Sequence, residues 1–481
     1  MTTQYQSIPQ NTLVMKFGGT SVGTTDAMRQ VVSIVKKEKA VWKNVIVVTS
    51  ASSGVTDMLL KMAAQSPQSD THTLEKAAVD IARKHEAITK DLVMDPVVTR
   101  KVNRQINEVL DQVVNLCKAI AVLGESTPRV MDIIASAGER MCIPLLAAAL
   151  QSADVSAEAV EATRLIVTDD HYTDAHPDLS KTKKNTCQVL EPLLAAGIVP
   201  VITGFLAATE TGNITTLGRG GSDYSAALIG AALPADDVWI YTDVNGVMTA
   251  DPRLVPDAAT VPVCSFREIA ELAYYGAKVL HPKTIRPVIE AGIGLRVCNT
   301  FNPDHSGTRL VSELGASHDV IKAITTIKGI KLITLEGRGM LGVPGVAART
   351  FETVARMGTS VPLITQASSE QSICFAVPSA SSDQVVTMLT KTFSNEIASR
   401  DIDRVWATEE VGIVTVVGEG MRYTPGVAGR VCTALGSNGV NVVAIAQGSS
   451  EVSISLVVNA DDIQNALRVL HQLINIKDSG K

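Results

Sequence analysis

The C-terminal third of this 481-residue chain contains an internal duplication, in which Gly418 repeats Gly337 at an offset of 81 residues. The same offset, without a gap, matches Gly339 to Gly420, Met340 to Met421, Pro344 to Pro425, Gly345 to Gly426, Val346 to Val427, Arg349 to Arg430, Gly358 to Gly439, Ile364 to Ile445 and Gln366 to Gln447. A gapless series of this length excludes chance. It predicts two copies of one supersecondary unit.

Each copy follows the order strand, helix, strand, strand, helix. In the first copy these segments are Leu332–Glu336, Pro344–Met357, Ser360–Gln366, Ser372–Val377 and Ser382–Asn395. The order resembles the ACT domain, an α+β unit of βαββαβ type that binds amino acids. The second copy ends soon after its last helix, and a strand-like run, Val320–Ile327, precedes the first copy. We therefore hypothesise that the two units exchange strands.

Ahead of the repeats, short apolar runs alternate with helical patterns. The strand-like runs are Leu13–Phe17, Val45–Ser50, Ile198–Thr203 and Val238–Thr242, and the helical segments include Thr25–Lys37, Pro144–Gln151 and Ser222–Ala232. This alternation predicts an α/β domain with a mostly parallel sheet between two helical layers. Residues 74–123 have helical spacing and are expected to form an excursion from the sheet. Asn302–His318, with Pro303 and two glycines, is expected to be a linker.

Composition narrows the class of protein. The net charge is −6, without basic runs, which argues against nucleic acid or a membrane surface as a partner. Met1–Thr12 lacks the features of a signal peptide, and no apolar run has the length of a membrane span. The seven cysteines include no Cys-x-x-Cys pair, so we expect free thiols in a reducing, cytoplasmic setting.

The first chemical motif is Lys16-Phe17-Gly18-Gly19-Thr20-Ser21-Val22, between a strand-like run and a helical one. Glycines let a backbone approach phosphate oxygens, and a helix N-terminus supplies N–H donors. Lys16 can offset phosphate charge. The lysine precedes the glycines, so the motif is not a Walker loop. The alternative interpretation is a tight turn with a solvated lysine.

A second glycine-rich motif is Thr216-Leu217-Gly218-Arg219-Gly220-Gly221-Ser222-Asp223. Arg219 can grip a carboxylate with two hydrogen bonds, and Asp223 can receive an ammonium group. Together these side chains suit an amino-acid substrate. The alternative is an ordinary turn in which Ser222 or Asp223 caps the following helix.

Three further motifs carry polar groups. Tyr241–Val247 follows a strand-like run, where α/β proteins place ligands, and Asp251-Pro252-Arg253 comes shortly after it. Tyr275–Pro282 contains Lys278 and a His281 that we interpret as structural. Ser136–Arg140 follows an apolar run, Val130–Ala135, which we predict to be a strand. Glu139 would then lie at a helix N-terminus, or it would receive a substrate ammonium group.

These motifs, in this order, resemble the aspartate kinase family over essentially the whole chain. The resemblance implies an amino-acid-kinase domain with an αβα sandwich at residues 1–310, then ACT domains at 318–400 and 401–481. It implies that Lys16 and Asp223 are catalytic. It implies that aspartate is bound by Ser50, Glu139, Arg219, Ser222 and Asp223. It implies that the nucleotide is bound by Lys16, Gly18, Gly19, Thr20, Ser21, Thr242, Asp243, Arg253 and Lys278. Many relatives have tyrosine where this chain has Met248.

The resemblance also implies transfer of the ATP γ-phosphoryl group to the β-carboxylate of L-aspartate, the first step of lysine, threonine and methionine biosynthesis. Mg²⁺ is expected to be held mainly through the phosphates, without a dedicated protein site. Feedback inhibition by an amino acid is expected at Gln366 and Gln447, with threonine favoured and lysine as the alternative. A homodimer or homotetramer is expected.

Other interpretations remain open. A kinase of glutamate or acetylglutamate shares the general fold, and an amino-acid sensor with an inactive kinase domain is the non-enzymatic alternative. No dinucleotide-binding domain follows the repeats in this sequence, so fusion to a homoserine dehydrogenase is not expected.

Overall fold

The structure is a computed structural model that describes residues 11–276, 280, 282–312, 319–340, 343–366 and 371–474. It divides into two compact units. The first unit comprises Met1–Val247, Pro262–Phe266 and Val279–Ser312, and the second comprises Met248–Val261, Arg267–Lys278 and Glu313–Lys481.

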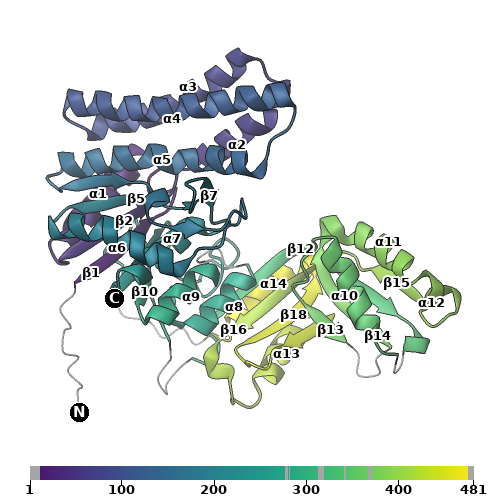
Figure 1. The fold of residues 1–481 in the computed structure, drawn as a ribbon. Coiled ribbons are helices and arrows are strands. Elements are labelled where there is room, and N and C mark those ends of the chain that lie inside the picture. The colour runs from purple at the N-terminus through teal and green to yellow at the C-terminus, as the bar shows by residue number, and fades with distance from the viewer. Residues whose placement is uncertain are drawn as a thin grey trace, which may run out of the picture. The chain divides into compact units, whose positions relative to one another are not determined.

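The first unit is built on a mostly parallel sheet (Figure 1). In spatial order, its strands among the described residues are β3 (Ala157–Val160), β5 (Val199–Thr203), β2 (Asn44–Thr49), β1 (Thr12–Phe17), β8 (Asp237–Thr242), β10 (Gly294–Asn299), β11 (Thr308–Val311) and β9 (Val263–Ser265). Only the β10–β11 pair is antiparallel among these neighbours. The central strands β1, β2 and β5 are buried along nearly their whole length, as expected for a sheet covered on both faces.

Helices cover both faces of this sheet. The helices of the unit are α1 (Thr25–Lys39), α2 (Val55–Gln65), α3 (Thr71–Leu92), α4 (Pro96–Leu123), α5 (Pro128–Ser152), α6 (Leu179–Ala195), α7 (Gly221–Ala232) and α9 (Pro282–Ala291). Helices α1 and α5 contact β2 from one side, while α6 contacts β5 and α7 contacts β1 and β8. The predicted αβα sandwich is therefore confirmed. The expected helical excursion is the α3–α4 pair, which lies beyond α5 in Figure 1.

The prediction of a strand at Val130–Ala135 is wrong, because the run lies inside α5. Thr127 caps this helix by accepting a hydrogen bond from the Val130 N–H, and Pro128 occupies its first turn. Helix α5 is long and apolar enough to cross a membrane, but 89% of its most apolar window is buried inside the fold. It is the central core helix of the unit.

The expected linker Asn302–His318 is also partly wrong. Within it, Thr308–Val311 forms β11, which pairs with β10 after a turn at Gly307, whose φ is +68°. Residues 313–318 lie outside the described part of the chain. A small second sheet beside the main one joins β4 (Val167–Thr168), β6 (Leu206–Thr209) and β7 (Ile214–Thr216).

The second unit has one sheet backed by helices. Its strands are β12 (Ala323–Glu336), β13 (Ile364–Gln366), β14 (Ser372–Pro378), β15 (Arg404–Ala407), β16 (Val411–Val417), β17 (Ala444–Gln447) and β18 (Ser453–Asn459). Its helices are α8 (Phe266–Tyr274, from its second residue on), α10 (Val346–Arg356), α11 (Ser382–Thr392), α12 (Ser394–Ala398), α13 (Val427–Ser437) and α14 (Ile463–His471). The two predicted α+β repeats are confirmed, although α10 begins at Val346 rather than Pro344 because Gly345 is its N-cap.

Each repeat takes one strand from the segment that precedes the other. The first half of β12 pairs with β16 of the second repeat, while β15 pairs with the second half of β12 in the first repeat. Two equivalent glycines, Gly337 and Gly418, show the same exchange of strands through their close backbone contacts. A Cβ atom on Gly337 would lie 2.3 Å from the Asp401 carbonyl oxygen, and one on Gly418 would lie 2.3 Å from that of Val320. The repeats therefore share one continuous sheet.

Two segments that precede the repeats in the sequence belong to this second unit. Ala250 and Val255 join the apolar core formed by α13, α14 and β16. From α8, the Glu268 carboxylate lies 3.1 Å from the Lys322 ammonium and accepts the Glu419 N–H at 2.7 Å. These buried contacts fix both segments to the repeats.

Candidate active site

A pocket of about 340 Å³ lies in the first unit at the carboxyl ends of β1 and β2. It is lined by Lys16, Ser50, Thr56, Glu139, Phe205, Gly218, Arg219, Gly220, Gly221, Ser222 and Asp223. Six of these are predicted site residues, and they come from four separate parts of the sequence. The open end of a parallel sheet brings them together, because parallel strands end at one edge.

The pocket contains a close ion pair. The Lys16 ammonium lies 2.5 Å from Asp223 Oδ1, and both side chains are largely shielded from solvent. Lys16 is the next-to-last residue of β1, and Asp223 lies in the first turn of α7. Gly220, with φ of +70°, is the N-cap of α7, and no side chain caps that helix. The interpretation of Ser222 or Asp223 as a cap is therefore not supported, and both side chains line the pocket.

Glu139 lies in the middle of α5, so the expectation of a helix N-terminal position is wrong. Its side chain is buried, and Oε2 has no hydrogen-bond partner among the described residues. Burial raises the pKa of Glu139 to about 8, against a smaller opposing effect of the Ala51 backbone and of Lys16. A buried carboxylate of this kind, facing a polar pocket, is suited to receive a cation.

The helix reaches the pocket closely because residue 138 is glycine. A Cβ atom on Gly138 would lie 2.5 Å from the Ala51 Cβ, so α5 touches the backbone that follows β2. That backbone is itself fixed by the hydrogen bond from the Ser50 N–H to the Phe17 carbonyl oxygen, at 3.0 Å. Ser50 and Glu139 therefore line the same pocket.

The first glycine motif forms a tight turn after β1. The Gly18 N–H donates to the Tyr241 carbonyl oxygen at 3.3 Å, and Gly19 accepts the Ser53 N–H at 3.0 Å. The Ser21 side chain is buried, with its hydroxyl 2.7 Å from that of Thr300, while Thr20 is exposed. None of these four motif residues (Gly18, Gly19, Thr20 and Ser21) lines the pocket itself, so their contact with phosphate stays a prediction.

The predicted nucleotide residues are divided between the two units. Thr242 ends β8 beside β1, and its hydroxyl donates to Asp243 Oδ1 at 3.1 Å. Arg253 belongs to the second unit, where its guanidinium pairs with Asp251 at 2.6 Å. Lys278 lies outside the described residues. The structure thus places Thr242 and Asp243 next to the first glycine motif. The nucleotide-binding roles of Arg253 and Lys278 stay predictions.

Sequence reasoning missed two pocket residues, Thr56 and Phe205. Phe205 has φ of +70° and follows the end of β5 by two residues. Its N–H donates a hydrogen bond to the Ser225 hydroxyl oxygen at 3.0 Å. Its place after a parallel strand was a usable signal, whereas nothing in the local sequence marks Thr56, in the first turn of α2.

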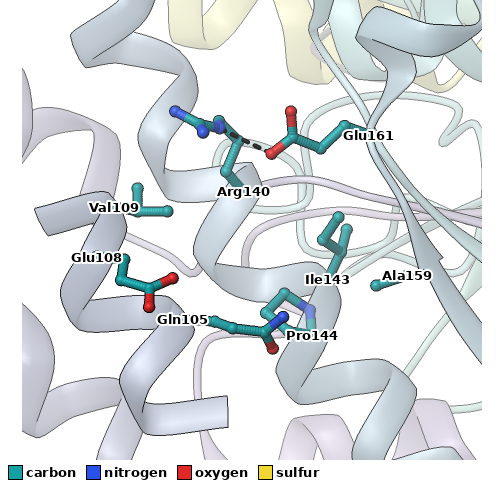
Figure 2. A pocket seen from close by; sticks show the side chains of 8 residues that line it. All are labelled: Gln105, Glu108, Val109, Arg140, Ile143, Pro144, Ala159 and Glu161. Atoms are coloured by element: carbon teal, nitrogen blue, oxygen red, sulfur yellow. Dashed lines mark hydrogen bonds and ion pairs between the residues drawn. The ribbon is translucent and has the colours of Figure 1, made fainter. Parts of the chain in front are cut away.

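A second pocket of the same unit, about 300 Å³, lies between α4, α5 and β3 (Figure 2). Arg140 points toward Glu161, with Nε 2.9 Å from Oε1, and its Nη1 donates to Gln112 at 2.8 Å. These contacts tie α5 to α4 and to the segment after β3. Because Arg140 follows Glu139 directly, they also help to hold the buried carboxylate in place.

In the second unit, a pocket of about 360 Å³ adjoins Gln366 at the end of β13. The remaining lining residues are Met340, Val343, Pro344, Gly345, Val346, Ala347 and Ile373. Gln447 ends β17 in the equivalent position of the second repeat. The Ser-Ser-Glu sequence after Gln366 lies outside the described residues.

Family models match both parts of the chain. Residues 11–299 match the amino acid kinase family, and residues 333–393 and 414–473 match an ACT domain. The chain therefore belongs to the amino acid kinase family and carries two ACT domains behind its kinase domain.

Within that family, the similarity is to aspartokinases. A crystal structure of E. coli aspartokinase III in complex with aspartate and ADP is 31% identical, with a TM-score of 0.79, covering 96% of this chain and 99% of that one. Aspartokinase 1 of Arabidopsis thaliana is 31% identical, covering 96% of this chain and 80% of its own length. The bifunctional aspartokinase/homoserine dehydrogenase of Haemophilus influenzae is 33% identical over 96% of this chain and 56% of its own length. The chain spans about half the length of the bifunctional relatives it matches.

Proposed function

We propose that this chain is an ATP-dependent aspartate kinase, which transfers the γ-phosphoryl group to the β-carboxylate of L-aspartate. The observation that carries the proposal is the single pocket that joins Lys16, Glu139, Arg219 and Asp223. It offers two cations and two carboxylates, which matches a zwitterionic substrate with a second carboxylate. Arg219 would bind the α-carboxylate, and Glu139 and Asp223 would face the ammonium group.

The chemistry needs no general base, because a carboxylate with a pKa near 3.9 is ionised at neutral pH. A β-carboxylate oxygen attacks the γ-phosphorus, and the bond to the β–γ bridging oxygen breaks, giving 4-phospho-L-aspartate and ADP. The obstacle is repulsion between two anions. Lys16 lies where it would meet both of them, and the glycine turn after β1 would present backbone N–H groups to the phosphates.

Mg²⁺ fits this site as a companion of the nucleotide. Among the described residues, no group of three or more His, Cys, Asp or Glu side chains is placed to hold a metal ion. We propose that the cation is held mainly by the phosphate oxygens, where it would neutralise part of their charge.

The proposal is tested by incubating the purified chain with ATP, Mg²⁺ and single acidic amino acids, and trapping acyl phosphates with hydroxylamine. We expect hydroxamate and ADP to form together with L-aspartate, and not with L-glutamate or N-acetyl-L-glutamate. Preference for either of the latter would assign a different carboxylate kinase. Failure of all three substrates would support the non-enzymatic sensor.

We also propose that an amino acid inhibits the enzyme by binding the ACT domains. The pocket beside Gln366 supports a small ligand there, and Gln447 occupies the equivalent place. E. coli aspartokinase III has been solved with lysine and aspartate in a T-state. We nevertheless favour threonine, because glutamine occupies both equivalent positions, Gln366 and Gln447, and a glutamine there resembles the pattern of threonine-sensitive relatives. Initial rates with threonine, lysine and both together decide between them, and Gln366→Ala should weaken inhibition without changing the uninhibited rate.

The remaining parts of the proposal concern organisation. Residues 1–310 would form the catalytic domain, and residues 318–400 and 401–481 the two regulatory domains. The edge strands β13 and β17 suit pairing with a second copy, so we propose a homodimer or homotetramer. Light scattering on the purified chain measures this. We place the enzyme in the cytoplasm, at the first step of lysine, threonine and methionine biosynthesis.

A further inference from the structure

Asp132 is a buried carboxylate outside the pocket, and hydrogen-bond donors from two distant segments converge on it. Its exposed fraction is 1%. Oδ1 accepts the Thr216 hydroxyl at 2.7 Å, and Oδ2 accepts the Thr216 N–H at 3.1 Å. The Thr173 N–H lies 3.1 Å from Oδ1 and 3.0 Å from Oδ2. Each of these groups donates to Asp132, a pattern that fits an ionised carboxylate and opposes the rise in its pKa that burial causes.

Thr216 is the last residue of β7, and the pocket loop begins directly after it. Arg219 follows three residues later, beyond Gly218, whose φ is +71°. The Arg219 side chain is exposed, and within the described part of the chain it forms no hydrogen bond or ion pair that would fix its position. The anchoring of Thr216 by Asp132 restrains the base of this loop, together with the hydrogen bond from the Leu217 N–H to the Phe205 carbonyl oxygen at 2.9 Å.

The segment around Thr173 packs against the same loop. Thr173 has φ of +75°, a rare conformation for a β-branched residue, which requires support from its surroundings. The Ala175 N–H donates to the Thr216 carbonyl oxygen at 2.9 Å. A Cβ atom on Gly218 would lie 2.3 Å from Asp174 Oδ1. Asp132 therefore holds two touching segments at once.

Asp132 and Glu139 lie seven residues apart on α5. Seven residues are about two helical turns, so both carboxylates occupy one side of the helix, about 10 Å apart along its axis. One rigid element thus carries the residue that anchors the Arg219 loop and the residue proposed to face the substrate ammonium group. Their relative placement fixes the spacing of the two substrate-binding ends.

We propose that Asp132 is a positioning residue, which sets the distance between Arg219 and Glu139 and so matches the pocket to the α-carboxylate and ammonium group of one amino acid. The inference rests on the proposed function, since it assumes aspartate in this pocket. It predicts that a substitution at Asp132 weakens aspartate binding, which raises the aspartate KM, and changes the rate of phosphoryl transfer little.

Asp132→Asn tests this with little change in volume. The amide nitrogen replaces an acceptor oxygen by a donor, which then faces the N–H groups of Thr173 or Thr216. We expect the aspartate KM to rise about tenfold or more, because a hydrogen-bonded charge is lost from the loop anchor. The ATP KM should stay within about twofold and kcat within about threefold, since Lys16 and the first glycine turn are untouched.

A second readout separates positioning from general damage. Aspartate α-amide lacks the charged α-carboxylate, so the unchanged protein should prefer aspartate strongly in kcat/KM. In Asp132→Asn we expect the ratio of kcat/KM for aspartate to kcat/KM for the α-amide to fall about tenfold, because a displaced Arg219 binds the α-carboxylate less tightly. A merely structural role would lower both rates alike and leave their ratio unchanged.

Two further variants keep the test decisive. Thr216→Val removes the hydroxyl donor alone, and we expect a smaller rise in the aspartate KM, about threefold to tenfold. Asp70→Asn is the matched control, because Asp70 caps α3 through the Thr73 N–H in the helical excursion and contacts neither Thr173 nor Thr216. It should lower the melting temperature slightly and leave both KM values unchanged. If Asp132→Asn does not fold, Thr216→Val answers the question by the same measurements.

The outcomes are distinguishable. Unchanged aspartate KM and unchanged preference in folded Asp132→Asn would overturn the inference and leave the proposed function intact. Equal rises in the aspartate and ATP KM values would also overturn it. Absence of aspartate phosphorylation by the unchanged protein would overturn the proposed function, and this inference with it.

Discussion

The Glu139 carboxylate destabilises the folded protein when it is ionised, and we propose that it binds the substrate ammonium group. In the free protein its carboxylate is buried, and burial raises its pKa to about 8, well above the 4.5 of an exposed glutamate. The folded state therefore favours the protonated form, and this contribution to stability is lost as the pH rises from about 4.5 toward 8. A substrate ammonium group reverses the balance, since it favours the charged carboxylate.

The first prediction is a pH-dependent aspartate KM. Below about pH 8 a proton occupies Glu139 and must leave before the ammonium group binds, so the KM should fall as the pH rises, by up to about tenfold per unit. Initial rates between pH 6.5 and 8 measure this. Glu139→Gln should raise the KM and abolish its slope with pH, and it should also stabilise the fold above neutral pH. A slope that persists in this variant would contradict the assignment.

The second prediction concerns Lys16, whose ammonium pairs with Asp223 inside the pocket. Lys16→Ala removes a preorganised charge from the site of transfer, and we expect kcat to fall by about 10²–10³. The matched control is Lys36→Ala, because Lys36 is an exposed lysine of α1. Near-normal turnover of Lys16→Ala would show that the lysine has no part in phosphoryl transfer.

Among the helices and strands, α5 is one that the sequence analysis predicts wrongly, since it expects a strand at Val130–Ala135. Its apolar run at Val130–Ala135 is too short for periodicity to separate a strand from a helix. The decisive signal precedes it, since Thr127 and Pro128 are typical of a helix cap and first turn. Because α5 includes this run, Glu139 lies in the middle of the helix rather than at its end. Asp132 lies two turns before it on the same helix.

The third prediction tests the close approach of α5 to the pocket. In Gly138→Ala the new Cβ atom would meet the Ala51 Cβ at 2.5 Å. We expect a loss of about 1–3 kcal/mol in the free energy of unfolding, as for overpacked cores, and weaker aspartate binding. Gly429→Ala in α13 is the matched control, because nothing lies within 4 Å of its added Cβ. It should stabilise the protein by about 0.5–1 kcal/mol, and urea unfolding measures both.

At the scale of the whole molecule, the two repeats cannot be separated without breaking a sheet. The strands β12 and β15 are exchanged between them, so each repeat completes the other. The second unit also includes Met248–Val261 and Arg267–Lys278, which the sequence assigns to the kinase part of the chain. The two repeats therefore pack directly on the segment that contains Asp251–Arg253 and on the segment that begins at Arg267.

The fourth prediction addresses the ion pair that fixes one of these segments. Lys322 and Glu268 are 8% and 1% exposed, respectively. Lys322→Met removes one partner of a buried carboxylate, and we expect a loss of about 3–5 kcal/mol in the free energy of unfolding. Adding Glu268→Gln should recover part of it. Arg286→Met, which breaks an exposed pair with Glu290, should change stability by less than about 1 kcal/mol. A small effect of Lys322→Met would contradict the importance of the pair.

The sequence by itself determined the features that are local. The glycine turns beside Lys16 and Arg219 and the alternation of strands with helices depend on neighbouring residues, so they can be predicted from spacing. The 81-residue duplication is visible by comparing the sequence with itself. Only the tertiary structure decided which distant groups share a surface. Phe205 and Thr56 line the pocket with residues that are distant in sequence, and Asp132 reaches its loop across 84 residues. The burial of Glu139 depends on the whole sheet around it. The burial of a side chain and the meeting of distant residues depend on how the whole chain packs. They determine the pKa values and charges in the pocket on which the proposed function rests.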